Sequence, residues 1–156
     1  MTSLPRVELV EVDEDEFESL FAMFETYCDE IEPLDVLLGE RPSSEERRES
    51  LLDGAEEESW FWIEVGGERA GFLMAQTYED DPRPGEQATE ILECYVVPER
   101  RRRGIAAAAV EALLQNERGR GTALVEAGIL HGNEGAQAFW RAMGFDTRSV
   151  QVARRP

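Results

Sequence analysis

The stretch from residue 98 to residue 114, PERRRRGIAAAAVEALL, places four consecutive arginines before a glycine and an alanine-rich segment. Ile105, Ala109 and Leu113 fall on one side of a 3.6-residue period, so a helix is predicted after Gly104. The first turn of a helix has backbone N–H groups without partners, which makes the start of a helix a binding site for anions. An anion site is therefore predicted here, and a solvated, charged turn is the alternative interpretation.

On both sides of this helix the spacing of apolar residues predicts further elements. Alternation with period two predicts strands, and spacing near 3.6 residues predicts helices. Strands are expected at 6–12, 59–65, 69–78, 89–97, 123–129 and 146–153, and helices at 13–31, at about 34–57, from 104 onward and at 134–144. The order is β-α-α-β-β-β-α-β-α-β, without an internal repeat or a linker, so one domain is expected over residues 1–156.

The charge of the chain is strongly acidic and unevenly distributed. The formal net charge is −18, and residues 1–60 hold 20 acidic and 4 basic residues. Phosphate binding needs a basic surface, so nucleic acid is not expected as a partner, whereas a cationic ligand is compatible with this charge. A solvated, self-repelling surface is the alternative explanation, and all 16 basic residues are arginine.

Neither a membrane segment nor a metal site is predicted. No stretch approaches the roughly 18 apolar residues of a membrane helix, and the first residues lack the basic and apolar regions of a signal peptide. A cytoplasmic protein without a membrane partner is therefore expected. Cys28 and Cys94 form no CxxC pair, so both are interpreted as small buried thiols and no metal ligand is assigned.

Two motifs resemble those of one family, the GNAT superfamily of acyl-CoA-dependent N-acetyltransferases. RRRGIA at 101–106 is similar to its pyrophosphate motif Q/R-x-x-G-x-G/A, and it follows YVVPE, which resembles the family's fourth strand. NEGAQAFWRAMGF at 133–145 is similar to its second signature, N-x-x-A-x-x-F-Y-x-x-x-G-F. The resemblance implies an α/β (α+β) fold in which four helices flank a mixed central sheet of about six strands. It also implies transfer of an acetyl group from acetyl-CoA to a primary amine.

The resemblance further implies where the cofactor, acetyl-CoA (coenzyme A), binds. The pantetheine arm is expected in a V-shaped gap between the strands at 89–97 and 123–129, and the pyrophosphate at the start of the helix after the arginines. The expected cofactor-binding residues are Tyr95, Val96, Val97, Arg101, Arg102, Arg103, Gly104, Ile105, Ala106, Ala107, Asn133, Ala136, Phe139 and Trp140.

In this family the amine attacks the thioester directly, so a base must take a proton from the ammonium group. Glu93 is the first candidate, because burial on the strand beside the cofactor raises the pKa of a carboxylate; a structural or surface carboxylate is the alternative. His131 is the second candidate. The tyrosine that serves the family as general acid is replaced by Trp140, which is not a proton donor and is interpreted as core. Tyr95, Cys94 or an ordered water is then the candidate acid, and departure of the thiolate without help from the protein is the alternative.

The acceptor is expected to be a small cationic amine, such as an aminoglycoside-like or polyamine-like compound, because acidic residues gather around the expected pocket. These residues are Glu25, Asp29, Glu30, Glu32, Asp35, Asp80 and Asp81. The alternative is that they form the solvated face of the helices. The residue at position 140 also supports a second hypothesis, a non-catalytic acyl-CoA-binding module. A homodimer is compatible with the family resemblance.

Overall fold

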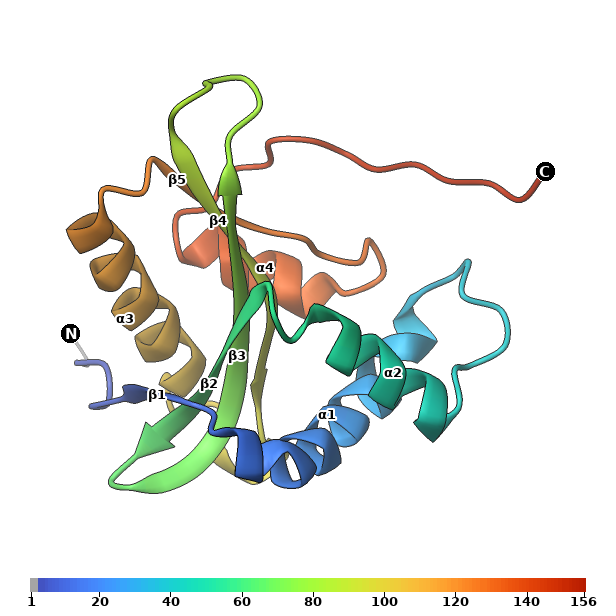
Figure 1. Cartoon of the computed structure of the whole chain (residues 1–156), viewed down its shortest axis with the longest axis horizontal. Helices are drawn as coiled ribbons and strands as arrows, with labels where there is room; N and C mark the ends of the chain where they lie inside the picture. Colours follow the sequence, from blue (N-terminus) through green and yellow to red (C-terminus); the bar gives the residue numbers. More distant parts are fainter. Residues whose placement is uncertain (1–2) are drawn as a thin grey trace.

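A five-stranded sheet forms the centre of the computed structural model, which describes residues 3–156 (Figure 1). The strands are β1 (Glu8–Glu11), β2 (Glu58–Val65), β3 (Glu68–Glu79), β4 (Gln87–Val96) and β5 (Leu124–Ala127), and they lie in this order. Neighbours are antiparallel except for β4 and β5, which are parallel. A parallel pair needs a long crossover, and α3 (Ile105–Arg120) provides it.

Helices cover both faces of the sheet. They are α1 (Phe17–Ile31), α2 (Ser44–Gly54), α3 and α4 (Glu134–Ala142), with short 3₁₀ turns η1 (Glu14–Glu16), η2 (Glu32–Leu34) and η3 (Pro98–Arg100). Figure 1 shows α1 and α2 on one side of the sheet and α3 on the other. The side chain of Ser43 caps α2 by accepting a hydrogen bond from the N–H of Glu46 at 3.1 Å.

Alternation along the strands divides the core into two parts. On β3, Leu73 packs in the core beneath α3 and α4, whereas Phe72 and Met74 pack in the core beneath α1 and α2. Side chains two positions apart on a strand share a face. Glu93 and Tyr95 of β4 therefore both lie on the α1 face of the sheet.

Strands β4 and β5 pair over four positions and then separate. The parallel pairing ends with Ile91 opposite Ala127. At the same point β4 has a bulge, because β3 advances by one residue while β4 advances from Ile91 to Glu93, which leaves Leu92 unmatched. The remainder of β4 has no strand neighbour on one edge, and the gap between the two strands lies where it was expected.

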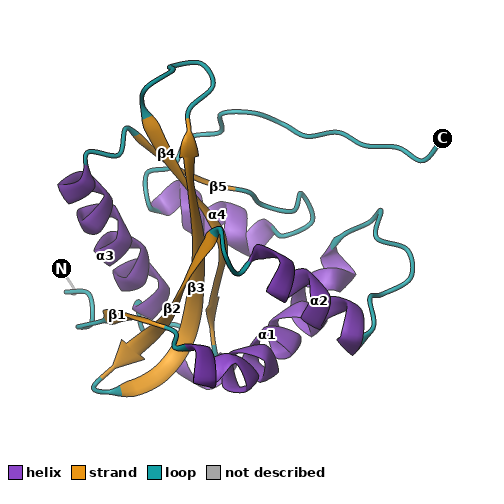
Figure 2. Ribbon diagram, viewed as in Figure 1, coloured by secondary structure: helices purple, strands orange, loops and turns teal. Residues whose placement is uncertain are grey.

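The last predicted strand does not form. Residues 146–156 have no strand conformation, and Figure 2 shows them as an extended loop. The guanidinium group of Arg148 bonds to Asp80 and to Glu126, at 3.0 Å in each case, so ion pairs rather than a ladder hold this segment. Val150 is 80% exposed and has no apolar surface to cover. Alternation alone was misleading here, because a strand also needs a partner edge.

The rest of the predicted order is confirmed. The fold is of the α/β (α+β) class, with a mixed sheet and four flanking helices, but the sheet has five strands in place of about six. Within residues 3–156, no helix combines the length and the apolar character needed to cross a membrane.

Candidate functional site

The start of α3 presents backbone N–H groups that the helix does not use. Gly104 is the N-cap residue, has a φ of 75° and carries no side chain that could cap the helix. The first helical hydrogen bond runs from the N–H of Ala108 to the carbonyl of Gly104 at 3.0 Å. The N–H groups of residues 105–107 precede it, at the positive end of the helix dipole, and the first turn holds no acidic residue. This arrangement is suited to binding an anion.

A groove of about 250 Å³ adjoins the start of α3. Its walls come from β4, the arginine turn, the first turn of α3 and α4. The lining residues are Val96, Arg100, Arg101, Arg102, Gly104, Ile105, Ala106, Ala107 and Phe139. All except Arg100 belong to the predicted cofactor-binding set. The structure therefore brings Phe139 of α4 next to the predicted residues of β4 and the start of α3.

Only two of the four consecutive arginines are free to offer their charge to a ligand. The first two are held in ion pairs to glutamates, Arg100 to Glu68 and Arg101 to Glu30. Arg102 and Arg103 are exposed and form no ion pair within residues 3–156. The unpaired positive charge beside the groove therefore comes from Arg102 and Arg103.

The free edge of β4 offers fewer backbone groups than the sequence predicted. The N–H of Val97 donates to the carbonyl of Ala70 at 2.9 Å, on the side of β3. The carbonyl of Val96 accepts a hydrogen bond from Nε of Arg101 at 2.8 Å. Amide groups alternate between the two edges of a strand, so the N–H of Val96 and the backbone of Cys94 face the gap. Of the predicted residues Tyr95, Val96 and Val97, Val96 alone directs its backbone N–H to the gap, and Cys94 was not in the predicted set.

Helix α4 closes the other side of the groove with Phe139. Asn133 is its N-cap, and the side-chain oxygen of Asn133 accepts a hydrogen bond from the N–H of Ala136 at 3.0 Å, so this oxygen is committed to the helix. Trp140 is 8% exposed and packs edge-on against Phe139 and Phe145, with ring centroids 5.0 and 4.9 Å apart. Trp140 therefore belongs to the core, as the sequence indicated.

Glu93 lies on the α1 face of β4, directly after the bulge. The hydroxyl of Tyr27, on α1, donates a hydrogen bond to Oε2 of Glu93. Burial raises the pKa of Glu93 to about 7, the hydrogen bond from Tyr27 opposes this rise, and the charges of Glu58 and Glu90 add to it. A carboxylate with a pKa near 7 is partly ionised at neutral pH and strongly basic for its type, so it is suited to accept a proton.

Tyr95 lies two residues further along the same face. Its ring packs against the rings of Tyr27 and Phe72, with centroids 5.6 Å away in both cases. Its hydroxyl is buried and forms no direct hydrogen bond within residues 3–156, and the Arg101 guanidinium lies 5.3 Å from the ring centroid. Burial raises the pKa of Tyr95 against the opposing charge of Arg101, so the hydroxyl keeps its proton. Cys94 packs on the opposite face, where burial raises the pKa of its thiol to about 12.

His131 lies in the exposed loop between β5 and α4. Its backbone carbonyl accepts a hydrogen bond from Nε2 of Gln137 at 2.6 Å, but its ring forms no hydrogen bond or ion pair within residues 3–156. The loop lies against η2, because a Cβ atom on Gly132 would be 2.7 Å from the carbonyl oxygen of Leu34. The structure thus separates the second candidate base from the buried surroundings of the first.

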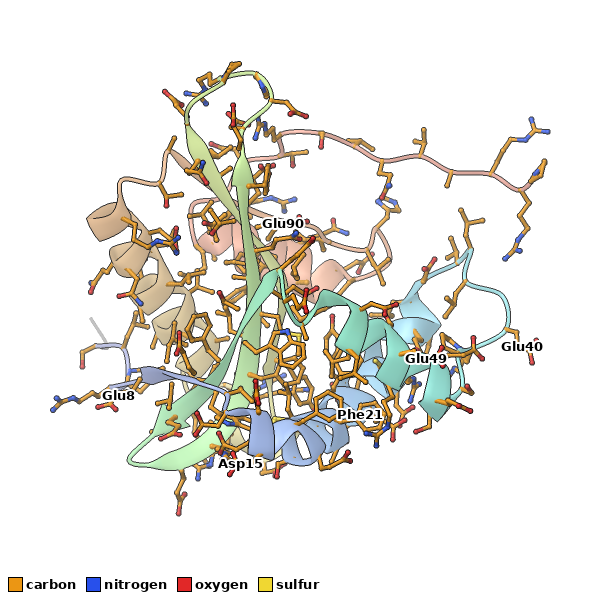
Figure 3. All side chains as sticks on the ribbon, in the orientation of Figure 1. Glu8, Asp15, Phe21, Glu40, Glu49 and Glu90 are labelled. Carbon is orange, nitrogen blue, oxygen red and sulfur yellow. The ribbon has the colours of Figure 1, made fainter. Side chains whose placement is uncertain are left out.

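A row of carboxylates crosses the α1 face of the sheet. Its members, from β2 to β5, are Glu58, Glu93, Glu90 and Glu126. The hydroxyl of Tyr78 donates to Glu126, whereas burial, followed by the charge of Glu126, raises the pKa of Glu90. Figure 3 shows Glu90 over the central sheet, and other acidic side chains at the periphery: Glu8, Asp15, Glu40 and Glu49.

Most of the acidic residues predicted to attract a cationic acceptor are instead paired inside the protein, which corrects that expectation. Arg47 of α2 bonds to three carboxylates of the α1 segment: Glu25 at 3.5 Å, Asp29 at 2.9 Å and Glu32 at 2.5 Å. Glu30 is taken by Arg101, and Asp80 is 1% exposed and bonded to Arg148. Arg47 has one positive charge against three carboxylates, so these contacts offset only part of the negative charge and weaken its attraction for a cationic ligand.

Sequence reasoning missed Tyr27 and Glu90. Tyr27 falls three residues after Phe24, on the stripe of apolar residues that α1 buries, and a hydroxyl on such a stripe needs a polar partner. Glu90 stands three residues before Glu93 on β4, and the bulge at Leu92 brings both onto one face. The role of Tyr27 could have been predicted from the sequence, whereas the position of Glu90 could be predicted only if the bulge were known.

Comparison with known proteins agrees with this geometry. The model of the acetyltransferase (GNAT) family matches residues 14–145. The N-acetyltransferase MJ1207 of Methanocaldococcus jannaschii is 30% identical over 95 residues, which are 61% of this chain and 42% of that protein, so the chain spans less than half of this relative's length.

Two solved structures share the fold. YycN from Bacillus subtilis has a TM-score of 0.77 at 18% identity and covers 97% of this chain and 99% of its own. An aminoglycoside acetyltransferase from an uncultured soil metagenomic sample, in complex with sisomicin, has a TM-score of 0.67 at 18% identity. The match covers 97% of this chain and 95% of that one. Since the family model matches most of the sequence, the chain belongs to the GNAT family of acetyltransferases.

Proposed function

We propose that the protein transfers the acetyl group of acetyl-CoA to a primary amine of a small cationic compound, with Glu93 as the general base. The observation that carries the proposal is the position of Glu93: it follows the bulge at which β4 separates from β5, and it is buried enough to be basic at neutral pH. A carboxylate placed there lies on β4 where this strand leaves β5, three residues before Val96, which lines the groove at α3.

The groove has the chemistry that coenzyme A requires. The N–H groups of residues 105–107 and the exposed Arg102 and Arg103 fit a pyrophosphate, because both kinds of donor favour phosphate oxygens. The N–H of Val96 and the backbone of Cys94 fit the amide groups of the pantetheine arm. Acetyl-CoA supplies an acetyl group activated as a thioester.

Glu93 takes one proton from the ammonium nitrogen of the acceptor, directly or through one water, and thereby makes the nitrogen lone pair available for attack. His131 is the weaker candidate, because it is exposed and lies in a loop. For the proton that the leaving sulfur needs, Tyr95 is preferred to Cys94. The hydroxyl of Tyr95 has no partner and shares the face of Glu93, whereas Cys94 packs on the other face.

The surroundings of Glu90 favour an acceptor that carries a positive charge. Glu90 lies on the face of Glu93, it has no hydrogen-bond donor within residues 3–156, and its raised pKa reflects burial beside another carboxylate. An ammonium group there relieves the repulsion between Glu90 and Glu126. The aminoglycoside acetyltransferase that shares the fold acts on a compound of this class, but its 18% identity is too low to assign the acceptor.

The test is release of coenzyme A thiol from acetyl-CoA with three acceptors: spermidine, sisomicin and a neutral peptide with a free N-terminus. We expect turnover with a polyamine or the aminoglycoside, and we expect Glu90→Gln to lower kcat/KM for cationic acceptors only. Equal rates with the neutral peptide contradict the cationic acceptor. A rise in Tm with acetyl-CoA but no thiol with any amine supports the acyl-CoA-binding module instead.

A further inference from the structure

Tyr27 is the one donor that contacts the Glu93 carboxylate within residues 3–156. The other ionisable groups around Glu93 are Glu58 on β2 and Glu90 on β4, whose negative charges oppose its ionisation. The thiols of Cys28 and Cys94 lie nearby, and burial raises the pKa of each to about 12, so they are neutral. The negative charge of an ionised Glu93 is therefore stabilised by a single hydrogen bond, from the phenol of Tyr27.

The phenol of Tyr27 is held rigidly. Its ring meets Phe72 edge-on at 5.8 Å and Tyr95 edge-on at 5.6 Å, and Phe24 packs against it at 6.1 Å. Burial, followed by the charge of Glu93, raises the pKa of Tyr27 far above its usual value, so the hydroxyl keeps its proton and acts as a donor.

The helix that carries Tyr27 is itself fixed to the rest of the fold. Leu20 and Cys28 of α1 are buried against the sheet, at 0% and 6% exposure. The three-carboxylate contact of Arg47 ties the end of α1 to α2. The hydroxyl is therefore held at Glu93 by elements that are packed and paired within the fold.

We infer that Tyr27 is a positioning residue that orients the Glu93 carboxylate and favours its ionised form. The inference rests on the proposed role of Glu93 as the base. When Glu93 takes a proton from the ammonium nitrogen, the protonated carboxyl becomes a donor, and the phenol oxygen of Tyr27 is placed to accept. Tyr27 thus stabilises the base in its working form without exchanging a proton with the acceptor.

The test replaces Tyr27 with phenylalanine and follows Glu93 directly. In protein labelled with ¹³C-glutamate, the carboxyl signal that Glu93→Gln removes is titrated by NMR. Tyr27→Phe is expected to raise the pKa of Glu93 by roughly one unit or more, because a hydrogen bond to the charged form is lost. In the same variant the acid limb of kcat/KM moves to higher pH by the same amount, and activity recovers when the pH exceeds the new value.

Tyr78→Phe is the matched control, because Tyr78 also donates to a partly buried carboxylate on this face, that of Glu126. It is expected to leave both the Glu93 signal and the acid limb in place. An unmoved Glu93 signal in Tyr27→Phe overturns the inference, as does an equal movement in Tyr78→Phe. The titration decides this even if the wild-type protein acetylates no amine, a result that overturns the proposed function alone.

Discussion

The indole ring of Trp140 stands edge-on to the ring of Phe145, with centroids 4.9 Å apart and an interplanar angle of 68°. The tyrosine of the family motif is thus replaced by a residue that fills the core. We expect Trp140→Tyr to lower the free energy of unfolding by about 1–3 kcal/mol, because the smaller ring leaves space and buries a hydroxyl. We expect it not to raise kcat. Chemical denaturation and thiol release measure the two effects, and a gain in kcat would show that position 140 faces the leaving group.

The raised pKa of Glu93 predicts how stability depends on pH. The folded protein holds the Glu93 proton up to about pH 7, whereas the unfolded chain releases it near 4.5, the ordinary pKa of a glutamate. Burial of this carboxylate therefore costs stability increasingly as pH rises through that window, and the cost is constant above it. Glu93→Gln removes the cost, so its advantage in free energy of unfolding over the wild type should grow from pH 5 to pH 7.5, to an order of 3 kcal/mol in urea denaturation. An advantage that does not change with pH refutes the raised pKa.

A negative charge at the start of α3 should weaken cofactor binding. Ala106 lies in the first turn and lines the groove. Ala106→Glu places a carboxylate where the N–H groups of residues 105–107 attract an anion, and it should weaken acetyl-CoA binding by at least tenfold in calorimetry. Ala138→Glu, at an exposed position of α4, is the matched control and should bind normally. Equal affinities of the two variants for acetyl-CoA would show that the start of α3 does not bind the anion.

Arg47 is predicted to be the main polar tie between α1 and α2. Its side chain is 10% exposed and holds three carboxylates. Arg47→Ala leaves these charges without a partner and should destabilise the fold by about 3 kcal/mol. Arg48→Ala is the neighbouring control: Arg48 pairs with the exposed Glu18, and its loss should cost much less. Urea denaturation compares them, and similar losses would show that burial gives the Arg47 contacts no added strength.

The sequence predicted the elements wherever the period of apolar residues coincided with a surface to cover. The stripe of α1 and the alternation of β2 to β4 matched the two cores, whereas the valines of residues 146–153 alternate without a sheet edge beside them. The same limit applied to charge. Composition located the acidic half of the chain but could not show which carboxylates Arg47 and Arg148 hold, because those contacts join distant segments.

The candidate site divides in the same way. The glycine and small residues at the start of α3 follow from local backbone requirements, so the sequence identified them. Glu93 lies on a strand, as expected, but its surroundings depend on the bulge at Leu92 and on Tyr27 from α1. Neither the bulge nor this contact across 66 residues leaves a periodic signal in the sequence.

The central claim is that Glu93 removes a proton from an amine held beside acetyl-CoA. The most direct test measures two quantities for Glu93→Gln: the affinity for acetyl-CoA and the rate of thiol release with spermidine. We predict that the affinity for acetyl-CoA is unchanged and that kcat is lower by about 10²–10⁴-fold, the usual contribution of a general base. Wild-type turnover by Glu93→Gln at neutral pH would contradict it.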